Sequence, residues 1–183
     1  MTRLMLIVVF ALTGGAASAT ADEDVDNLCT DLINSIAAND LIAYAQCWST
    51  IRHTTRGMKT LFPNLTDKDM QRIEDKFHAR NTTIRHSFRV IREQVTDPNA
   101  KIQFVSAETR VKTETIGDNE ITGFSMLLCR FRVNEQEWLL KLDDGILLDN
   151  RWFLSDDPVS LETHEKRIKL RKFKGKYGHV TEK

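Results

Sequence analysis

The chain has 183 residues, and its 26 Lys and Arg balance its 26 Asp and Glu. This length suits one domain with a real hydrophobic core, and no apolar run approaches the roughly 20 residues that span a bilayer. The charge is unevenly placed, because residues 166–183 hold eight Lys and Arg against one Glu, whereas residues 22–165 hold 17 against 25 Asp and Glu. The sequence therefore predicts an acidic body with a basic tail.

Residues 1–21 have the pattern of a secretory signal peptide. Arg3 precedes nine apolar residues, Leu4–Leu12, and small residues follow, with Ala-x-Ala cleavage patterns at 17–19 and 19–21. The short apolar run favours a cleaved leader over a membrane anchor. We expect an exported protein, periplasmic or extracellular, in which a domain over 22–160 precedes the basic tail at 161–183.

Three cysteines, Cys29, Cys47 and Cys129, follow the predicted leader. An oxidising compartment permits a disulfide, and the odd count leaves at least one thiol free. Cys29 and Cys47 fall on the apolar stripes of two adjacent predicted helices, so they could meet. Three buried free thiols are the alternative that we favour, because cysteine packs well as a small apolar residue.

Apolar residues at helical spacing predict two helices near the start of the mature chain. The first runs from about 23 to 37. Asn39-Asp40 then stops it and starts the next, because both residues favour caps and turns. The second helix carries Tyr44, Trp48 and Ile51 on its apolar face.

The longest helix is predicted at residues 67–95, after a loosely patterned connection at 57–63. Thr66 precedes acidic residues, which suits the positive end of a helix dipole. An apolar stripe then continues along the segment. Arg80 and Asn81 interrupt this stripe, so we expect a kink or break there.

Strands fill the rest of the predicted domain. They are expected at residues 102–113, 124–133, 137–144 and 145–158, with turns at 116–119, 134–136 and 149–150. In the second strand, Phe124, Met126 and Leu128 are expected on one face and Leu127, Cys129, Phe131 and Val133 on the other. Because both faces are apolar, we expect helices to cover one and a second subunit or the tail to cover the other. The predicted fold class is α+β, with N-terminal helices packed on a bent, cone-like antiparallel sheet.

Two segments, NDLIAYAQCWS at 39–49 and DDGILLDNRWFLSDDP at 143–158, place Trp48 and Trp152 at the opening helix and at the last strand. Over residues 24–158 this pattern of size and polarity resembles the nuclear-transport-factor-two-like superfamily, which includes ketosteroid-isomerase-like and polyketide-cyclase-like domains. The resemblance implies a cone with an internal pocket, often in a homodimer joined through the outer sheet face. It implies no single function. The acidic base and hydrogen-bonding partner of the isomerase-like members cannot be placed in this chain.

Several side chains are candidate walls of such a pocket. The binding candidates are Tyr44, Trp48, Arg130 and Trp138. Aromatic walls are usual in ligand sites, although the same residues also suit a plain core. Arg130 could bind an anion by bidentate hydrogen bonds, unless its strand simply emerges into water there. Asp143 is a weak candidate for a catalytic base, because it ends an apolar strand; a turn role is the alternative.

Neither a metal nor a cofactor is expected. The five histidines are His53, His78, His86, His164 and His179, and they lack the spacing of metal ligands. On the long helix, Arg85, Arg89 and Arg92 share one face, which could meet an anion or simply be solvated.

The tail supplies the remaining candidate surface. Its basic residues are Lys166, Arg167, Lys169, Arg171, Lys172, Lys174 and Lys176. They could bind an anionic surface, or the tail could be disordered or fold back on the acidic body. We do not expect nucleic acid as the partner of an exported protein.

Three functions follow from these features. The first is a non-catalytic domain that holds a small apolar or anionic ligand in the cone. The second is an enzyme of the isomerase, dehydratase or hydrolase kind in the same pocket. The third is an interaction protein that docks on an anionic surface through its tail.

Overall fold

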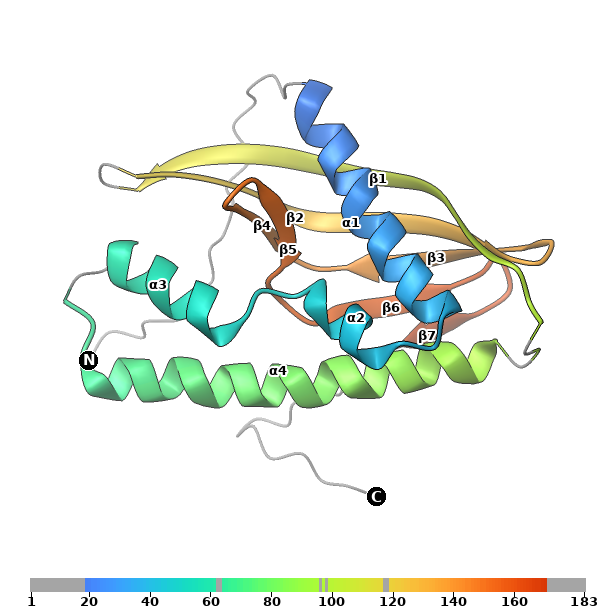
Figure 1. The fold of residues 1–183 in the computed structure, drawn as a ribbon, viewed down its shortest axis with the longest axis horizontal. Helices are drawn as coiled ribbons and strands as arrows, with labels where there is room; N and C mark the ends of the chain where they lie inside the picture. Colours follow the sequence, from blue (N-terminus) through green and yellow to red (C-terminus); the bar gives the residue numbers. More distant parts are fainter. Residues whose placement is uncertain (1–18, 62–63, 96, 98, 117–118, 171–183) are drawn as a thin grey trace.

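The computed structural model describes residues 19–61, 64–95, 97, 99–116 and 119–170. Helices α1 (Ala19–Ala37), α2 (Leu41–Gln46), α3 (Ile51–Leu61) and α4 (Asp67–Gln94) come first (Figure 1). Strands β1 (Ile102–Ile116), β2 (Asn119–Val133), β3 (Gln136–Leu142), β4 (Gly145–Leu148), β5 (Arg151–Leu154), β6 (Pro158–Glu162) and β7 (Arg167–Lys169) follow. The predicted α+β class is confirmed. Most of the predicted leader, 1–18, lies outside the described residues.

The seven strands form one antiparallel sheet around β2. One edge of β2 pairs with β1 along nearly its whole length. Its other edge pairs with β4 near its start and with β3 near its end, which gives the order β5-β4-β2-β3-β6-β7. The two branches, β4-β5 and β3-β6-β7, therefore diverge from the same strand.

Helices cover one face of this sheet, which we call the inner face. α1 crosses the strands, α4 runs along one border of the sheet and contacts β6, and α2 and α3 lie beside α4 (Figure 1). Apolar residues recur in α1 at helical spacing, and all are buried: Val25, Leu28, Cys29, Leu32, Ile33 and Ile36. They meet inner-face side chains of the sheet in a single core.

A bulge in β2 changes one predicted face. Thr109 pairs with Leu127 and Val111 pairs with Phe124, so β2 has one residue more than β1 between these two pairs. The bulge turns Phe124 into the core with Leu127, whereas Met126 remains 40% exposed. The prediction that Phe124 shares a face with Met126 is therefore wrong.

The predicted second helix is also interrupted. α2 ends at Gln46, and Trp48 forms an isolated bridge with Leu154 of β5. Leu154 N donates to Cys47 O at 2.8 Å, and Ser49 N donates to Leu154 O at 2.9 Å. Because this backbone pairs with β5, it cannot continue the helix. Residues 51–61, half of them predicted as a connection, form α3 instead.

The sheet extends beyond the boundary predicted at residue 160. β6 runs to Glu162, and β7 pairs with it antiparallel. Leu161 and Leu170 are both buried in the core. The first ten residues of the predicted tail therefore belong to the domain, and residues 171–183 lie outside the described part.

Candidate binding groove between α3 and α4

The predicted aromatic pocket walls lie in the core. The Tyr44 ring is 4.9 Å from the Trp48 ring and 5.0 Å from the Phe88 ring, measured between centroids. The Tyr44 hydroxyl hydrogen-bonds Ser87 Oγ at 3.1 Å, and burial raises the pKa of Tyr44. Trp48 Nε1 donates to the Asp156 carbonyl at 2.8 Å. These two rings therefore fill space between the helices and the sheet.

Trp138 lies elsewhere in the same core. Its ring stacks on Phe131 at 6.5 Å, and Lys166 Nζ lies 4.9 Å from its centroid. Lys166 also donates to Gln94 Oε1 at 2.9 Å, which links the β6–β7 turn to the end of α4. Trp138 is thus covered by a cation from the segment predicted as tail.

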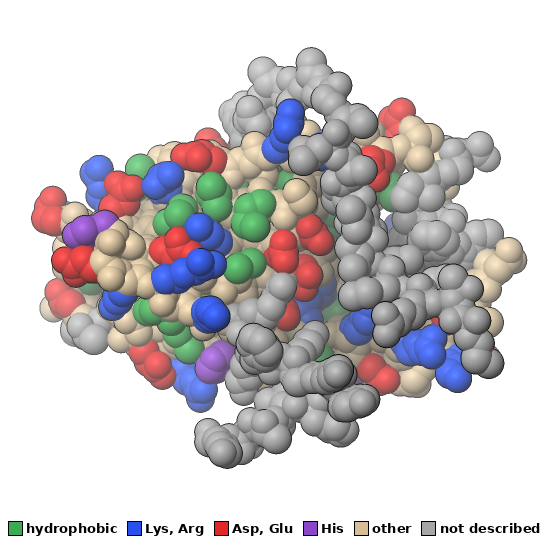
Figure 2. Space-filling view, turned by 180° about the vertical axis from the view of Figure 1, so that it is seen from behind, with side chains coloured by type: hydrophobic (Ala, Val, Ile, Leu, Met, Phe, Trp, Pro, Cys, Tyr) green, Lys and Arg blue, Asp and Glu red, His purple; other side chains and the backbone are tan. Residues whose placement is uncertain are grey.

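Arg130 lies on the opposite face of the sheet from these rings. Its Nε is 3.2 Å from Glu108 Oε1, and its Nη1 is 3.5 Å from Glu137 Oε1. A second group of ion pairs on this outer face contains Glu162, whose carboxylate lies 3.0 Å from Lys141 Nζ and 2.8 Å from Arg167 Nε. Figure 2, seen from behind, shows hydrophobic side chains among charged ones on this side. The structure therefore does not bring Arg130 together with Tyr44, Trp48 and Trp138.

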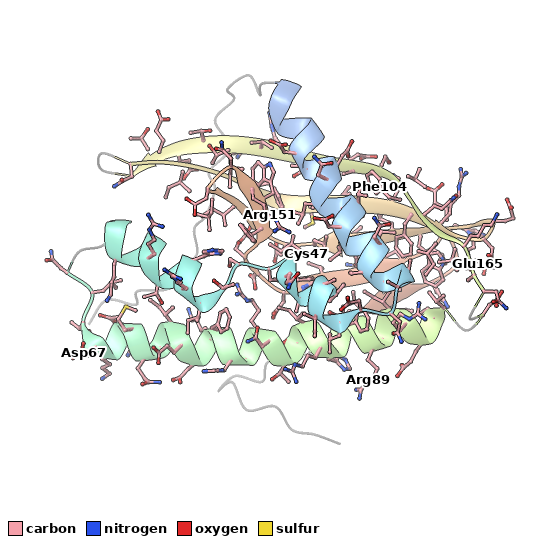
Figure 3. The ribbon with its side chains drawn as sticks, in the orientation of Figure 1. Cys47, Asp67, Arg89, Phe104, Arg151 and Glu165 are labelled. Atoms are coloured by element: carbon pink, nitrogen blue, oxygen red, sulfur yellow. The ribbon has the colours of Figure 1, made fainter. Side chains whose placement is uncertain are left out.

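The other predicted candidates are dispersed. Asp143 is half-buried where β3 ends before β4. The basic ridge of α4 is divided, because Arg92 donates to Ile36 O at 2.9 Å, whereas Arg89 pairs with Glu93 at 3.8 Å and points away from the sheet (Figure 3). In the described part of the chain, no group of three or more His, Cys, Asp or Glu is arranged to hold a metal ion.

Part of the predicted tail is placed in the fold. Lys166, Arg167 and Lys169 are exposed, in or next to β7. Four further basic residues lie outside the described part: Arg171, Lys172, Lys174 and Lys176. None of the helices in the described residues is long and apolar enough to span a membrane.

Arg80 lies at a buried polar junction between elements. The sequence predicted a kink or break of the long helix at this residue. The residue is 9% exposed, and α4 is continuous through it. Arg80 Nη1 donates to Ser155 O at 2.8 Å and to Ser49 Oγ at 3.3 Å, and Nη2 donates to Ser49 O. Burial lowers the pKa of Arg80, and the carboxylates of Asp157 and Asp156 oppose this shift. Arg80 therefore ties α4 to the segment before α3 and to the turn after β5.

α3 starts directly at this junction. Thr50 Oγ1 accepts a hydrogen bond from His53 N at 3.3 Å, as expected of an N-cap residue. The His53 ring lies 5.0 Å from the ring of Phe153 in β5. One side of α3 therefore rests on the sheet, and α4 faces another side.

An open groove of about 640 Å³ lies between α3 and α4. The described residues that line it are Ile51, Arg52, Thr55, Arg56, Lys59 and Glu74. Five of them recur along α3 at helical spacing, so they form one stripe of the helix. Among these lining residues, Arg52, Arg56 and Lys59 are cationic, and Glu74 is a carboxylate. Ile51 adds an apolar side chain, and Thr55 adds a hydroxyl. Such a set can hold an anionic group by charge-assisted hydrogen bonds and an apolar group beside it.

The sequence prediction did not include these groove residues. The i, i+7, i+10 spacing of the apolar residues Ile51, Met58 and Leu61 was a weak signal for a helix in this segment. Gly57 and three threonines lower its helix propensity and obscured the pattern. No protein-family model, curated protein or solved structure matches this chain.

Proposed function

We propose that this protein is an exported, non-catalytic domain that binds a small anionic ligand with an apolar part in the α3–α4 groove. The observation that carries this proposal is that Arg52, Arg56 and Lys59 line the groove, whereas Glu74 supplies one carboxylate among its described lining residues. The sequence predicted such a ligand inside the cone. We place it in the groove, because the Tyr44 ring packs against its aromatic neighbours in the core.

An aromatic sulfonate, 1-anilinonaphthalene-8-sulfonate, is a suitable probe because it combines an anionic and an apolar part. We expect the folded protein to bind it with a fluorescence increase that falls as salt rises. The double variant Arg52→Glu/Lys59→Glu should bind at least about tenfold more weakly, since each lost charge-assisted hydrogen bond contributes roughly 1.5–3 kcal/mol. Circular dichroism of each variant checks that the fold is retained.

A matched control makes the same charge change away from the groove. Arg85 and Lys101 are exposed and do not line it, so Arg85→Glu/Lys101→Glu should retain the affinity of the parent protein. Equal affinity in the two double variants, or no binding of the probe by the parent protein, would show that the groove is not an anion site.

A second candidate function is docking on an anionic surface. Lys166, Arg167 and Lys169 are exposed directly before the basic segment 171–176. Because Leu170 is buried, the matching truncation removes residues 171–183 and leaves the sheet intact. We expect the full chain to sediment with phosphatidylglycerol vesicles and not with phosphatidylcholine vesicles, and the truncated chain to lose this binding. Undiminished binding by the truncated chain would exclude the tail as the docking element.

Three further expectations stay predictions. They are the nuclear-transport-factor-two-like cone, the homodimer through the outer sheet face, and an isomerase, dehydratase or hydrolase with Asp143 as base. The outer face carries both the partly exposed Met126 and ion pairs such as Arg130–Glu108, and interfaces likewise combine apolar and polar side chains. Sedimentation equilibrium of the parent protein tests the dimer.

A further inference from the structure

The hairpin of β1 and β2 reaches beyond the rest of the sheet. The two strands stay paired as far as Ile116 and Asn119, whereas β4 pairs with β2 only at Gly123 and Phe124. Beyond Gly123 the hairpin therefore has only two strands among the described residues, and it projects at one end of the sheet (Figure 1). A ribbon of two strands is marginally stable by itself, and a further strand would stabilise it.

β1 also leaves one edge of the sheet free. Its 15 residues pair with β2, and no other strand in the described part of the chain pairs with them. None of its described side chains, at 102–115, is buried. The backbone N–H and C=O groups of such an edge are a template for a strand from another molecule.

The charges near the end of β1 are complementary to those of a second copy of the strand. Lys112 and Glu114 lie two residues apart on one face, on either side of Thr113. None of the ion pairs among described residues includes either of them. If two β1 strands pair antiparallel about a two-fold axis at Thr113, Lys112 of each copy lies opposite Glu114 of the other, which stabilises the pairing. An axis at Lys112 or at Glu114 would instead place two like charges opposite each other.

The other face of the hairpin suits the same register. Thr113 Oγ1 lies 2.8 Å from Thr122 Oγ1 of β2. An axis at Thr113 places the threonine of the second copy beside this pair, so the row of hydroxyls continues through both copies. Threonine pairs of this kind contribute to the stability of antiparallel strands.

The position of α1 excludes another register. Glu108 and Arg110 would also lie opposite each other if the axis passed through Thr109. However, α1 packs against β1, and its first turns extend past the β1 edge about halfway along the strand (Figure 1). The α1 helices of two copies would collide at an axis there. The Thr113 end of β1 lies away from α1, so two copies can approach each other at that end.

We propose that two copies of this chain associate through the ends of their β1 strands, antiparallel about Thr113. The contact would add backbone hydrogen bonds along residues 110–116 and two Lys112–Glu114 pairs, and it would join the two sheets into one. It differs from the dimer through the outer sheet face that the sequence predicted. It does not depend on the α3–α4 groove.

Sedimentation equilibrium of the full chain over a range of protein concentrations tests the proposal, and we expect a monomer–dimer equilibrium. Lys112→Glu should weaken the dimer roughly tenfold or more, because two attractive cross-strand pairs become repulsive. The double variant Lys112→Glu/Glu114→Lys has the same net charge as the parent protein and should restore the dimer, because the exchanged charges are again opposite. Circular dichroism of each variant checks that the fold is retained.

Met126→Asp is the control for the outer sheet face and should leave the association unchanged, because Met126 lies outside the paired segment 110–116. A parent protein that stays monomeric at every concentration would overturn the proposal and show that the edge charges keep copies apart. A dimer that Lys112→Glu leaves intact, that the double variant does not restore, or that Met126→Asp disrupts would also overturn it.

Discussion

Replacing Arg80 with methionine tests whether a buried guanidinium holds the junction between α4, the start of α3 and the end of β5. Methionine restores the apolar stripe of α4, so a model in which Arg80 merely interrupts that stripe predicts a gain in stability. The hydrogen bonds to Ser49 and Ser155 predict the opposite, because two of the three acceptors are backbone carbonyls that no substitution removes.

The size of the loss can be estimated from these contacts. A buried acceptor left without its donor costs roughly 1–3 kcal/mol. Arg80→Met leaves the Ser49 and Ser155 carbonyls without this donor and takes the cation away from the buried Asp157. Because two carbonyls lose this donor, we expect the free energy of unfolding to fall by about 2–6 kcal/mol.

Urea unfolding followed by tryptophan fluorescence measures this change, since the Trp48 indole donates to the Asp156 carbonyl in the same region. Arg85→Met, on an exposed position of the same helix, is the control and should stay within about 0.5 kcal/mol of the parent protein. If Arg80→Met also stays within about 1 kcal/mol, the hydrogen bonds of Arg80 do not hold the junction.

Three other substitutions test single packing and hydrogen-bonding features by the same unfolding assay. Gly145→Ala places a Cβ against the ring of Phe124, so the ring must move, and we expect a loss of about 1–3 kcal/mol; no loss would show that the ring moves freely. Tyr44→Phe removes the buried contact with Ser87 and should cost about 1 kcal/mol, and a gain would contradict its contribution. Thr66→Ala removes the capping box of α4 and should also cost about 1 kcal/mol, whereas Thr66→Ser should cost less.

The sequence predicted the elements whose signals are local. The long helix was predicted at 67–95 and spans Asp67–Gln94, because a repeated stripe and an N-cap at Thr66 both lie within the segment. The turn predicted at 149–150 joins β4 to β5, and both residues have positive φ angles of 50° and 60°. Asn and Asp tolerate that backbone region better than most residues, so composition alone predicts such a turn.

The features that the sequence did not predict depend on residues far along the chain. Arg80 donates to Ser155, 75 positions away, and Trp48 donates to Asp156, 108 positions away. Neither contact leaves a local pattern, so Arg80 resembled a helix break and Trp48 resembled a helical stripe residue. The candidate site was also predicted without such long-range contacts, because its pocket walls were chosen by residue type alone. Arg130 was assigned to the pocket, although its side chain lies on the outer face of the sheet.

The junction and the groove are connected through the first residues of α3, and this connection makes a further prediction. Arg80 holds Ser49, and the next residue, Thr50, caps the helix that carries the groove cations. Arg80→Lys keeps the charge but cannot reproduce the forked contacts of a guanidinium. We expect α3 to lose its fixed position and the aromatic sulfonate probe to bind several-fold more weakly, while the protein stays folded. Tyr44→Phe serves as the control, because it removes a buried hydrogen bond to Ser87 away from the groove-lining residues and should leave probe affinity unchanged. If Arg80→Lys binds the probe as tightly as the parent protein, the groove does not depend on the junction, and α3 must be positioned by its contact with Phe153 instead.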